Sequence, residues 1–289
     1  MSGQETSKTV SVIITSHTWG RYGLFKEAIR SIESQTYDDI ELVLPLDGDP
    51  DMVETTELLT DGGAEITYDP ETTGLSEARN RGASNASGEI YAFLDDDCVA
   101  APEWIAELVA AFEDGAIAAG GPAIPEWPSE RPPHIPREFD WLIGGGPYYA
   151  EESEIRNTYG CNIAFRADVF HKLGGFDPAH GKNGNMAQAE ETELCVRMRE
   201  RFGKGLQYRP NATVRHRVFP EQLELLHLLK RAYHQGVSKR QIGLGDEEGD
   251  FLSEVGRSLY RNQPLESIAA LSYTASVGAG FLLGRREAT

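Results

Sequence analysis

The sequence alternates between short β-branched runs and amphipathic stretches, and this alternation constrains the fold more than any other feature. Residues 10–16 ("VSVIITS") have the length and composition of a buried strand, and residues 24–36 place apolar side chains on one helical face. Further strand-like runs at 40–48 and 89–97 flank a helical stretch at 76–86. Strands and helices that alternate in this way predict an α/β fold with a mostly parallel sheet, covered by helices on both faces.

The second half of the chain continues this pattern less regularly. Helices are predicted at 101–114 and 189–203, and the last strand of the sheet is predicted at 206–218. The proline-rich stretch at 120–141 predicts an irregular surface excursion, because proline cannot join an interior ladder or helix. The polar, glycine-containing stretch at 178–188 predicts a flexible loop.

Composition limits the partners and the compartment. A net charge of −19 over 289 residues argues against a nucleic-acid partner, which requires a basic surface. The seven lysines, set against many more acidic residues, favour a halophilic source, because salt screens the repulsion on such a surface. Three cysteines in no metal-binding spacing and a polar N-terminus without a signal peptide predict a cytoplasmic protein with reduced thiols.

Charge divides the chain into two parts. Residues 219–289 carry eight basic and nine acidic side chains, whereas the residues before them carry nineteen and thirty-seven. We therefore expect a main domain over 9–218 and a helical C-terminal region over 219–289. The uncharged run at 267–284 follows a basic helical stretch, which favours contact with a membrane surface. A buried or oligomer-forming helix and a true membrane span are the alternatives.

The stretch "FLDDDC" (93–98) places three like charges at the end of a buried strand. Burying adjacent carboxylates costs several kcal/mol each unless a cation or hydrogen-bond donors compensate them. In open α/β sheets the ligand site lies outside the carboxyl ends of the strands, where Thr15, Asp47 and Asp95 to Asp97 are all expected. The sequence therefore predicts a polar site at this edge, with a positive partner for the aspartates.

Six segments, in order and in register, resemble family 2 glycosyltransferases, which have the GT-A fold and use nucleotide-activated sugars. The segments are "VSVIITSHTW", "ELVLPLDGD", "GLSEARNRGA", "FLDDDCVAAPEW", "GCNIAFRADVFHKLGGFD" and "AEETELCVRM". The resemblance covers about residues 10 to 218. It implies a Rossmann-like, mostly parallel sheet flanked by helices, with a helical C-terminal appendage.

The resemblance implies a metal site. Asp95 and Asp97 would form the D-x-D element that holds Mn²⁺ or Mg²⁺, with Asp97 as the direct ligand, and such ions prefer carboxylate and phosphate oxygens. His216, in "TVRHRV", lies where some relatives supply a third ligand or a diphosphate contact. A solvated acidic turn and a structural histidine are the alternative interpretations.

The donor contacts are also implied by the resemblance. Thr15 and Asp47 match positions that touch the nucleotide base and ribose, and Arg79 matches an arginine that approaches the diphosphate or base. Asp96, which points away from its neighbours in an extended chain, is expected to contact the ribose or to serve local structure. For Asp47 a plain turn carboxylate is the alternative, and for Arg79 a helix partner of Glu77.

Glu191 stands where the family has its catalytic base, usually an aspartate. A carboxylate there would take the proton from the attacking hydroxyl of the acceptor. The alternative is that Glu190 and Glu191 complement the dipole at the start of a helix.

The function implied is inverting, metal-dependent transfer of a hexose or hexuronic acid from a nucleoside diphosphate sugar, expected to be UDP-linked. The basic and apolar C-terminal segments favour a lipid-linked (dolichyl phosphate) saccharide acceptor at the cytoplasmic face of the cell membrane. With the halophilic composition, this indicates glycan assembly for protein N-glycosylation, as in similar archaeal enzymes. Two alternatives stay open: transfer to bare lipid phosphate, as in a polyprenyl-phosphate monosaccharide synthase, and a non-catalytic module that binds nucleotide sugar or Ca²⁺.

Overall fold

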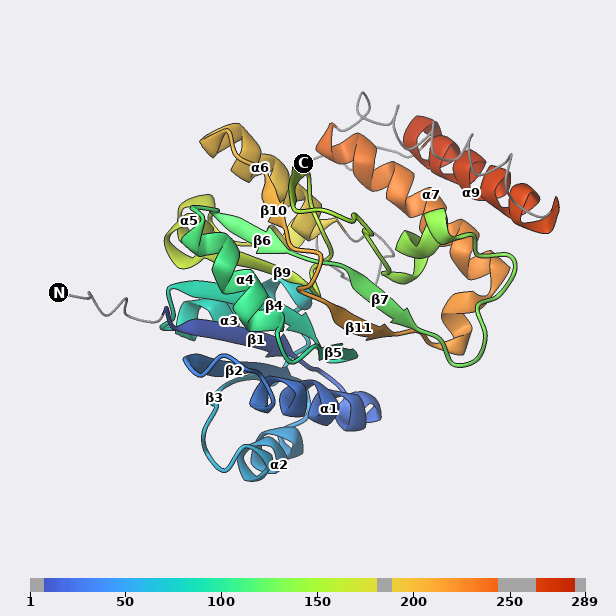
Figure 1. Ribbon diagram of the computed structural model, residues 1–289. Helices are drawn as coiled ribbons and strands as arrows, with labels where there is room; N and C mark the ends of the chain where they lie inside the picture. Colours follow the sequence, from blue (N-terminus) through green and yellow to red (C-terminus); the bar gives the residue numbers. More distant parts are fainter. Residues whose placement is uncertain (1–7, 181–188, 244–263, 284–289) are drawn as a thin grey trace.

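The computed structural model describes residues 8–180, 189–243 and 264–283. Its centre is an eight-stranded sheet in the order β3-β2-β1-β4-β9-β6-β10-β8 (Figure 1). The strands β3, β2, β1 and β4 are parallel, while β9 runs antiparallel to both of its neighbours. The bounds of these strands are β1 Val10–Thr15, β2 Ile40–Asp47, β3 Glu65–Asp69, β4 Ile90–Asp95, β6 Ala118–Gly120, β8 Ser153–Ile155, β9 Ile163–Arg166 and β10 Leu206–Tyr208.

Helices cover both faces of this sheet, as the sequence pattern predicted. The strand β1 shows why, since Val10, Val12 and Ile14 join one hydrophobic cluster and Ile13 joins the other. The first cluster includes side chains from α1 (Tyr22–Glu33), α2 (Asp51–Leu59) and α4 (Trp104–Glu113). The second includes side chains from α3 (Leu75–Asn85), α5 (Ala167–Leu173) and α6 (Glu190–Phe202). The prediction of an α/β fold is confirmed.

A smaller sheet lies beside the main one, in the order β5-β11-β7. Its strands are β5 Cys98–Ala100, β7 Ala123–Glu126 and β11 Val214–Arg217. The prediction of one continuous strand over 206–218 is wrong, because the chain turns at Pro210 and Asn211 between β10 and β11. Proline cannot donate to a ladder, so the strand ends there and the chain changes sheets.

The proline-rich stretch at 120–141 is also more regular than predicted. It contributes β7, an edge strand where Pro125 is tolerated, and the 3₁₀ helix η2 (Arg137–Ile143). Ile135 and Phe139 are almost fully buried, so this part of the stretch is not a surface excursion. It folds inward because its apolar side chains pack against the C-terminal helices.

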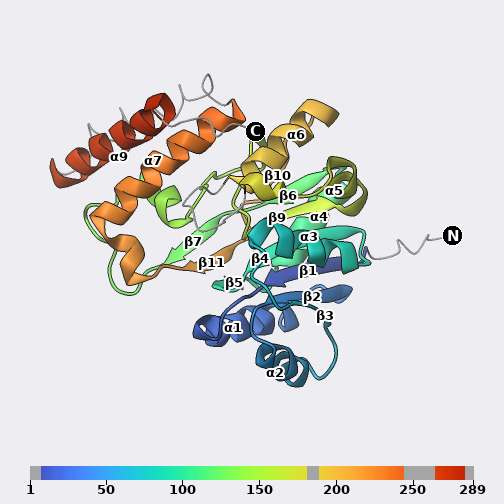
Figure 2. The ribbon, with the colours of Figure 1, turned by 180° about the vertical axis from the view of Figure 1, so that it is seen from behind.

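Those two helices, α7 (Leu225–Ile242) and α9 (Pro264–Leu283), lie side by side at the end of the molecule opposite α2 (Figures 1 and 2). Their backbones approach closely at Gly236 and Gly280, where a Cβ atom would lie within 2.0 Å of a carbonyl oxygen of the other helix. No helix in the described part of the chain is long and apolar enough to cross a membrane. Residues 181–188 of the predicted loop lie outside the described residues.

Short 3₁₀ helices complete the connections. They are η1 Trp19–Arg21, η3 Pro178–His180 and η4 Pro220–Leu223. The turn η1 directly follows β1 and, as shown below, supplies a residue of the site.

Candidate active site at the carboxyl edge of the sheet

The predicted site residues of three neighbouring strands lie at one edge of the sheet. Thr15 at the end of β1 is the register partner of Asp95 at the end of β4. On the other side, Ser16 bridges to Leu46 of β2, directly before Asp47. The expectation that these residues meet at the carboxyl ends of the strands agrees with this register.

Asp96 and Asp97 share one positive partner, Arg21. Its guanidinium Nη1 lies 3.0 Å from Asp97 Oδ2 and 3.3 Å from Asp96 Oδ1. Asp96 also accepts a hydrogen bond of 2.9 Å from the hydroxyl of Ser16. Burial and the neighbouring charge of Asp97 raise the pKa of Asp96 to about 6, although Arg21 opposes the shift. The sequence predicts a positive partner for the aspartates, and Arg21 is such a partner supplied by the chain itself.

Asp95 faces a different arginine. Arg79 of α3 is 2% exposed and donates hydrogen bonds of 2.5 Å to Asp95 Oδ1 and 3.1 Å to Glu190 Oε1. Although burial opposes the charge, these two carboxylates raise the pKa of Arg79. Gly160 permits this arrangement, because a Cβ atom there would lie 2.6 Å from the guanidinium of Arg79. In the structure, therefore, Arg79 fixes the positions of two site carboxylates.

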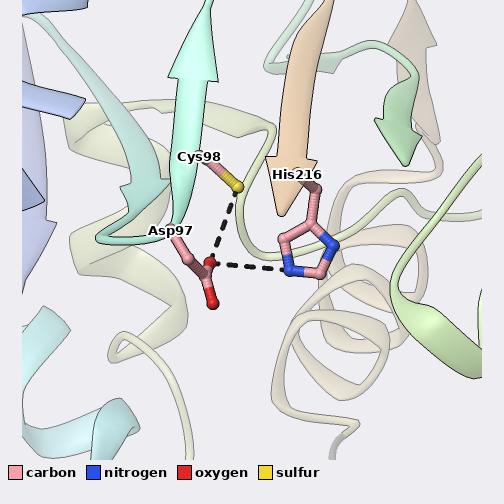
Figure 3. A group of neighbouring side chains, drawn as sticks. All are labelled: Asp97, Cys98 and His216. Carbon is pink, nitrogen blue, oxygen red and sulfur yellow. Dashed lines mark hydrogen bonds and ion pairs between the residues drawn. The ribbon is translucent and has the colours of Figure 1, made fainter. Parts of the chain in front are cut away.

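The turn after β4 brings Asp97 to His216. Because β5 pairs antiparallel with β11, Cys98 and His216 are register partners. His216 Nε2 lies 3.5 Å from Asp97 Oδ1, and the Cys98 thiol lies 3.9 Å from the same oxygen (Figure 3). The ligand atoms of these three residues lie within 4.8 Å of one another. Asp95 is not part of this group.

This group fits a divalent cation. Carboxylate oxygen and imidazole nitrogen are ligands that Mn²⁺ accepts. His216 is 9% exposed and presents Nε2 to Asp97, so a largely buried imidazole nitrogen faces the carboxylate. Gly144 leaves room for the ring, since a Cβ atom there would lie 2.8 Å from His216 Cε1.

Asp47 is held in place by the loop before α3. Its Oδ2 accepts hydrogen bonds of 3.1 Å from both the backbone N–H and the hydroxyl of Thr73. Its Oδ1 pairs with Arg81, two residues after Arg79 on the same helix. Asp47 is only 3% exposed, whereas the Arg81 side chain is 21% exposed. The carboxylate is therefore preorganised, and the arginine beside it remains partly accessible.

Glu191 lies in the first turn of α6, next to the Arg79-bound Glu190. Burial, together with the charge of Glu190, raises the pKa of Glu191 to about 8. Arg231 of α7 and Tyr159 interact electrostatically with Glu191. Burial lowers the pKa of Arg231, although Tyr159 and Glu191 oppose the shift. The C-terminal helices thus contribute a cation to the surroundings of Glu191.

The sequence analysis did not identify Arg21, Arg81 or Arg231 as site residues. Arg81 has a signal, since it is the second arginine of "EARNRG" in a segment already singled out. Arg21 and Arg231 have none, because only the folded chain brings η1 and α7 to the sheet edge.

Comparison with known proteins decides the family. Residues 11–174 match the model of the family described as "Glycosyl transferase family 2". The chain is also 33% identical to a glucosyl-dolichyl phosphate glucuronosyltransferase of Haloferax volcanii, over 95% of this chain and 96% of that protein. The chain belongs to glycosyltransferase family 2. The Haloferax relative also agrees with the halophilic source that the acidic composition predicts.

Other similarities are shorter or more distant. A succinoglycan biosynthesis protein of Rhizobium meliloti is 32% identical over 56% of this glycosyltransferase and 50% of the relative. Among solved structures, a mannosyltransferase from Pyrobaculum calidifontis, in complex with GDP-Man and Mn²⁺, has a TM-score of 0.64 at 14% identity, over 97% of this chain and 89% of that chain. GalNAc-T7 with UDP, GalNAc and Mn²⁺ has a TM-score of 0.57 at 18% identity, over 90% and 59%. The similarity to these two structures shows that this chain has the GT-A fold.

Proposed function

We propose that this glycosyltransferase moves a sugar, with inversion, from a UDP-sugar to a dolichyl-phosphate-linked saccharide, in the assembly of glycans for protein N-glycosylation. The observation that carries the proposal is that α6 brings a carboxylate of raised pKa, Glu191, to the sheet edge that holds Asp47, Asp95 and Asp97. The name of the Haloferax relative supports the lipid-linked acceptor and makes UDP-glucuronic acid the first donor to test.

Asp97 and His216 would hold Mn²⁺ or Mg²⁺, with Asp95 and the donor diphosphate completing the set. The pair at 3.5 Å and the buried imidazole support this assignment. When bound, the cation supplies neutralisation of the charge that builds up on the departing diphosphate. A cation also explains why three adjacent acidic residues are tolerated in a turn where Asp96 and Asp97 are less than a tenth exposed.

The donor nucleotide would lie over the ends of β1 and β2. Asp47 has a fixed carboxylate there, which can accept hydrogen bonds from a ribose hydroxyl or a base N–H, and Thr15 lies on the adjacent strand. Asp96 accepts a hydrogen bond from Ser16 and pairs with Arg21, which favours a supporting role over a direct ribose contact. Arg79 would act through the carboxylates that it holds, and its buried charge would favour an anionic donor nearby.

Glu191 would be the general base. A general base is most effective when its pKa is close to the working pH, and burial beside Glu190 shifts the pKa of Glu191 in that direction. The deprotonated carboxylate would accept the proton of the acceptor hydroxyl as that oxygen attacks the sugar. A neutral hydroxyl acceptor needs such a base, whereas an ionised phosphate does not.

The outer face of α9 supports a membrane-surface location. All exposed residues of α9 are apolar, namely Pro264, Leu265, Ile268, Leu271, Ala275, Leu282 and Leu283. Its neighbour α7 has no acidic residue and, besides Arg231 near Glu191, three basic residues that are at least partly exposed, on a chain whose net charge is −19. An apolar helix face combined with nearby basic residues is typical of segments that lie on anionic bilayers. We place the enzyme at the cytoplasmic face of the membrane, with 219–289 as the region that contacts the lipid.

Transfer to bare lipid phosphate is the second candidate function, and the basic Arg231 beside Glu191 is the observation that favours it. The two functions are separated by comparing Glu191→Gln with Asp97→Asn in a transfer assay with a glucosyl dolichyl phosphate and a dolichyl phosphate acceptor. If the acceptor is a saccharide, both variants lose transfer. If it is bare phosphate, Glu191→Gln keeps most of its activity. The non-catalytic module has no support, because the family is one of glycosyltransferases.

A further inference from the structure

Arg21 occupies a defined position between the aspartate turn and the C-terminal region. It ends η1, whose start is capped by the Thr18 hydroxyl accepting from Gly20 N at 3.3 Å. One side of its guanidinium bonds Asp96 and Asp97, and its Cζ lies 4.9 Å from the centroid of the Phe219 ring. A carboxylate pair and an aromatic face together hold the guanidinium in one place.

Arg21 and a divalent cation beside His216 would bind the two oxygens of the same Asp97 carboxylate. Arg21 Nη1 bonds Asp97 Oδ2 at 3.0 Å, while Oδ1 of the same carboxylate faces His216. A cation that ligates this carboxylate would stand within a few ångströms of the guanidinium. Two positive groups at that distance repel each other, and a site with little access to water screens the repulsion weakly.

We propose that Arg21 is an internal counter-ion that competes with the divalent cation for Asp97, so that the cation binds tightly only together with the donor diphosphate. The proposal rests on the metal role of Asp97 in the proposed function. The diphosphate matters because it brings anionic oxygens that can accept the guanidinium in place of Asp97. The Arg21 side chain is 32% exposed, so its guanidinium is accessible to such a ligand.

The consequence is coupling between two ligands. A cation that binds alone shares the Asp97 carboxylate with Arg21 and repels the guanidinium, without offering it another anion. A cation that binds with a nucleoside diphosphate meets no such cost, because the arginine exchanges one anion for another. Arg21 would therefore make cation and nucleotide binding cooperative, and this cooperativity must be reciprocal.

The test measures Mn²⁺ binding to the purified full chain by electron paramagnetic resonance of free Mn²⁺, with no sugar donor present. We expect Arg21→Gln to bind Mn²⁺ about tenfold more tightly than the unmodified chain, the size of one charge-assisted contact. Adding UDP or GDP should tighten Mn²⁺ binding strongly in the unmodified chain and much less in Arg21→Gln. Unchanged or weaker Mn²⁺ binding by Arg21→Gln would overturn the proposal.

Arg217→Gln is the matched control. Arg217 is 37% exposed, and its backbone N–H donates to the carbonyl of Asp97, but its side chain pairs with Glu27 and Glu126. Removing the charge of Arg217 should leave Mn²⁺ affinity within about twofold, because its guanidinium does not bond the carboxylates of the aspartates. An equal gain in both variants would mean that general electrostatics, and not competition for Asp97, sets the affinity, and this too would overturn the proposal.

Two further variants keep the outcome interpretable. Arg21→Lys retains the charge but lacks the planar fork, so we expect tighter Mn²⁺ binding by a smaller factor, and this variant decides the matter if Arg21→Gln fails to fold. Asp97→Asn reports on the proposed function. If it binds Mn²⁺ as the unmodified chain does, the assigned metal site is wrong, and the proposal for Arg21 falls with it. If Asp97→Asn loses Mn²⁺ while Arg21→Gln shows no gain, only the proposal for Arg21 fails.

Discussion

Arg79 donates a hydrogen bond of 3.1 Å to Glu190 and so ties the middle of α3 to the start of α6. The same guanidinium bonds Asp95, so one buried arginine connects the aspartate turn with the helix that carries Glu191. This side chain therefore links the residue two positions before Asp97 to the residue directly before Glu191. A change at Arg79 should affect both the stability and the geometry of the site.

We predict that Arg79→Leu lowers the free energy of unfolding by about 3 kcal/mol, because the buried Glu190 loses the charge of Arg79 beside it. Urea denaturation monitored by circular dichroism measures this loss. Arg166→Leu is the control, since Arg166 and Asp168 form an ion pair in which both side chains are nearly half exposed, and its loss should cost less than about 1 kcal/mol. Equal losses of unfolding free energy in the two variants would show that the buried Arg79–Glu190 pair contributes no more to stability than an exposed pair.

The rate of transfer should rise with pH through a limb near pH 8. Only deprotonated Glu191 can accept a proton, and burial beside Glu190 raises its pKa to about 8. Measurement of kcat from pH 6 to 9, with saturating donor and acceptor, should show this limb in the unmodified enzyme. In Glu191→Gln, kcat should fall by about 100-fold or more and lose the limb. A limb that persists in this variant would assign it to another group.

The same shift has a consequence for stability. A carboxylate whose pKa is raised by folding stabilises the fold most below the ordinary pKa of glutamate, and the contribution is lost as pH rises through about 8. Glu191→Gln removes this dependence. Its melting temperature, relative to that of the unmodified chain, should therefore be higher at pH 9 than at pH 5. A difference that does not change with pH would contradict the raised pKa.

Asp97→Asn should abolish Mn²⁺-dependent transfer, with a loss of about 100-fold or more, because it removes the carboxylate nearest His216. Isothermal titration with MnCl₂ in the presence of UDP should show the matching loss of cation binding. Asp114→Asn is the control, because that side chain is 77% exposed at the C-terminal end of α4 and should not change cation binding. Unaltered cation binding by Asp97→Asn would move the metal site elsewhere.

Binding to lipid vesicles should depend on the outer face of α9. We expect Ile268→Glu combined with Leu271→Glu to weaken co-sedimentation with vesicles rich in anionic lipid by about tenfold or more, because two exposed apolar contacts are replaced by charges. Leu58→Glu changes a leucine on α2 that is even more exposed, and it should leave co-sedimentation unchanged. Equal effects of both changes would argue against a specific face.

Local patterns predicted much of the fold. The strand over 10–16 and the helix over 76–86 match β1 and α3 to within a residue, because hydrophobic periodicity follows which face is buried. The helix α2 was not predicted, since only Met52 and Thr56 of its side chains are buried and the apolar signal is weak. The division of 206–218 between two sheets depends on long-range pairing with β6 and β5, which no local pattern encodes.

The site was predictable in part for a similar reason. The ends of parallel strands meet by topology, so Thr15, Asp47 and Asp95 could be placed together from the sequence. The sequence could not show which arginine pairs with which aspartate. Arg79 and Arg21 reach the aspartates from a helix and a turn, and the tertiary structure sets the orientations of both elements. The assignment of Arg79 to the donor diphosphate stays a prediction, and its structural contacts are with Asp95 and Glu190.

The most direct test of the central claim is transfer itself. The purified chain is incubated at high salt with Mn²⁺, a panel of UDP- and GDP-sugars, and dolichyl-phosphate-linked glucose, and the lipid product is read by mass spectrometry. The account predicts that one UDP-sugar adds a single residue to the acceptor, and that Asp97→Asn and Glu191→Gln both lose this product. The absence of both transfer and donor hydrolysis with every sugar in the panel would contradict it.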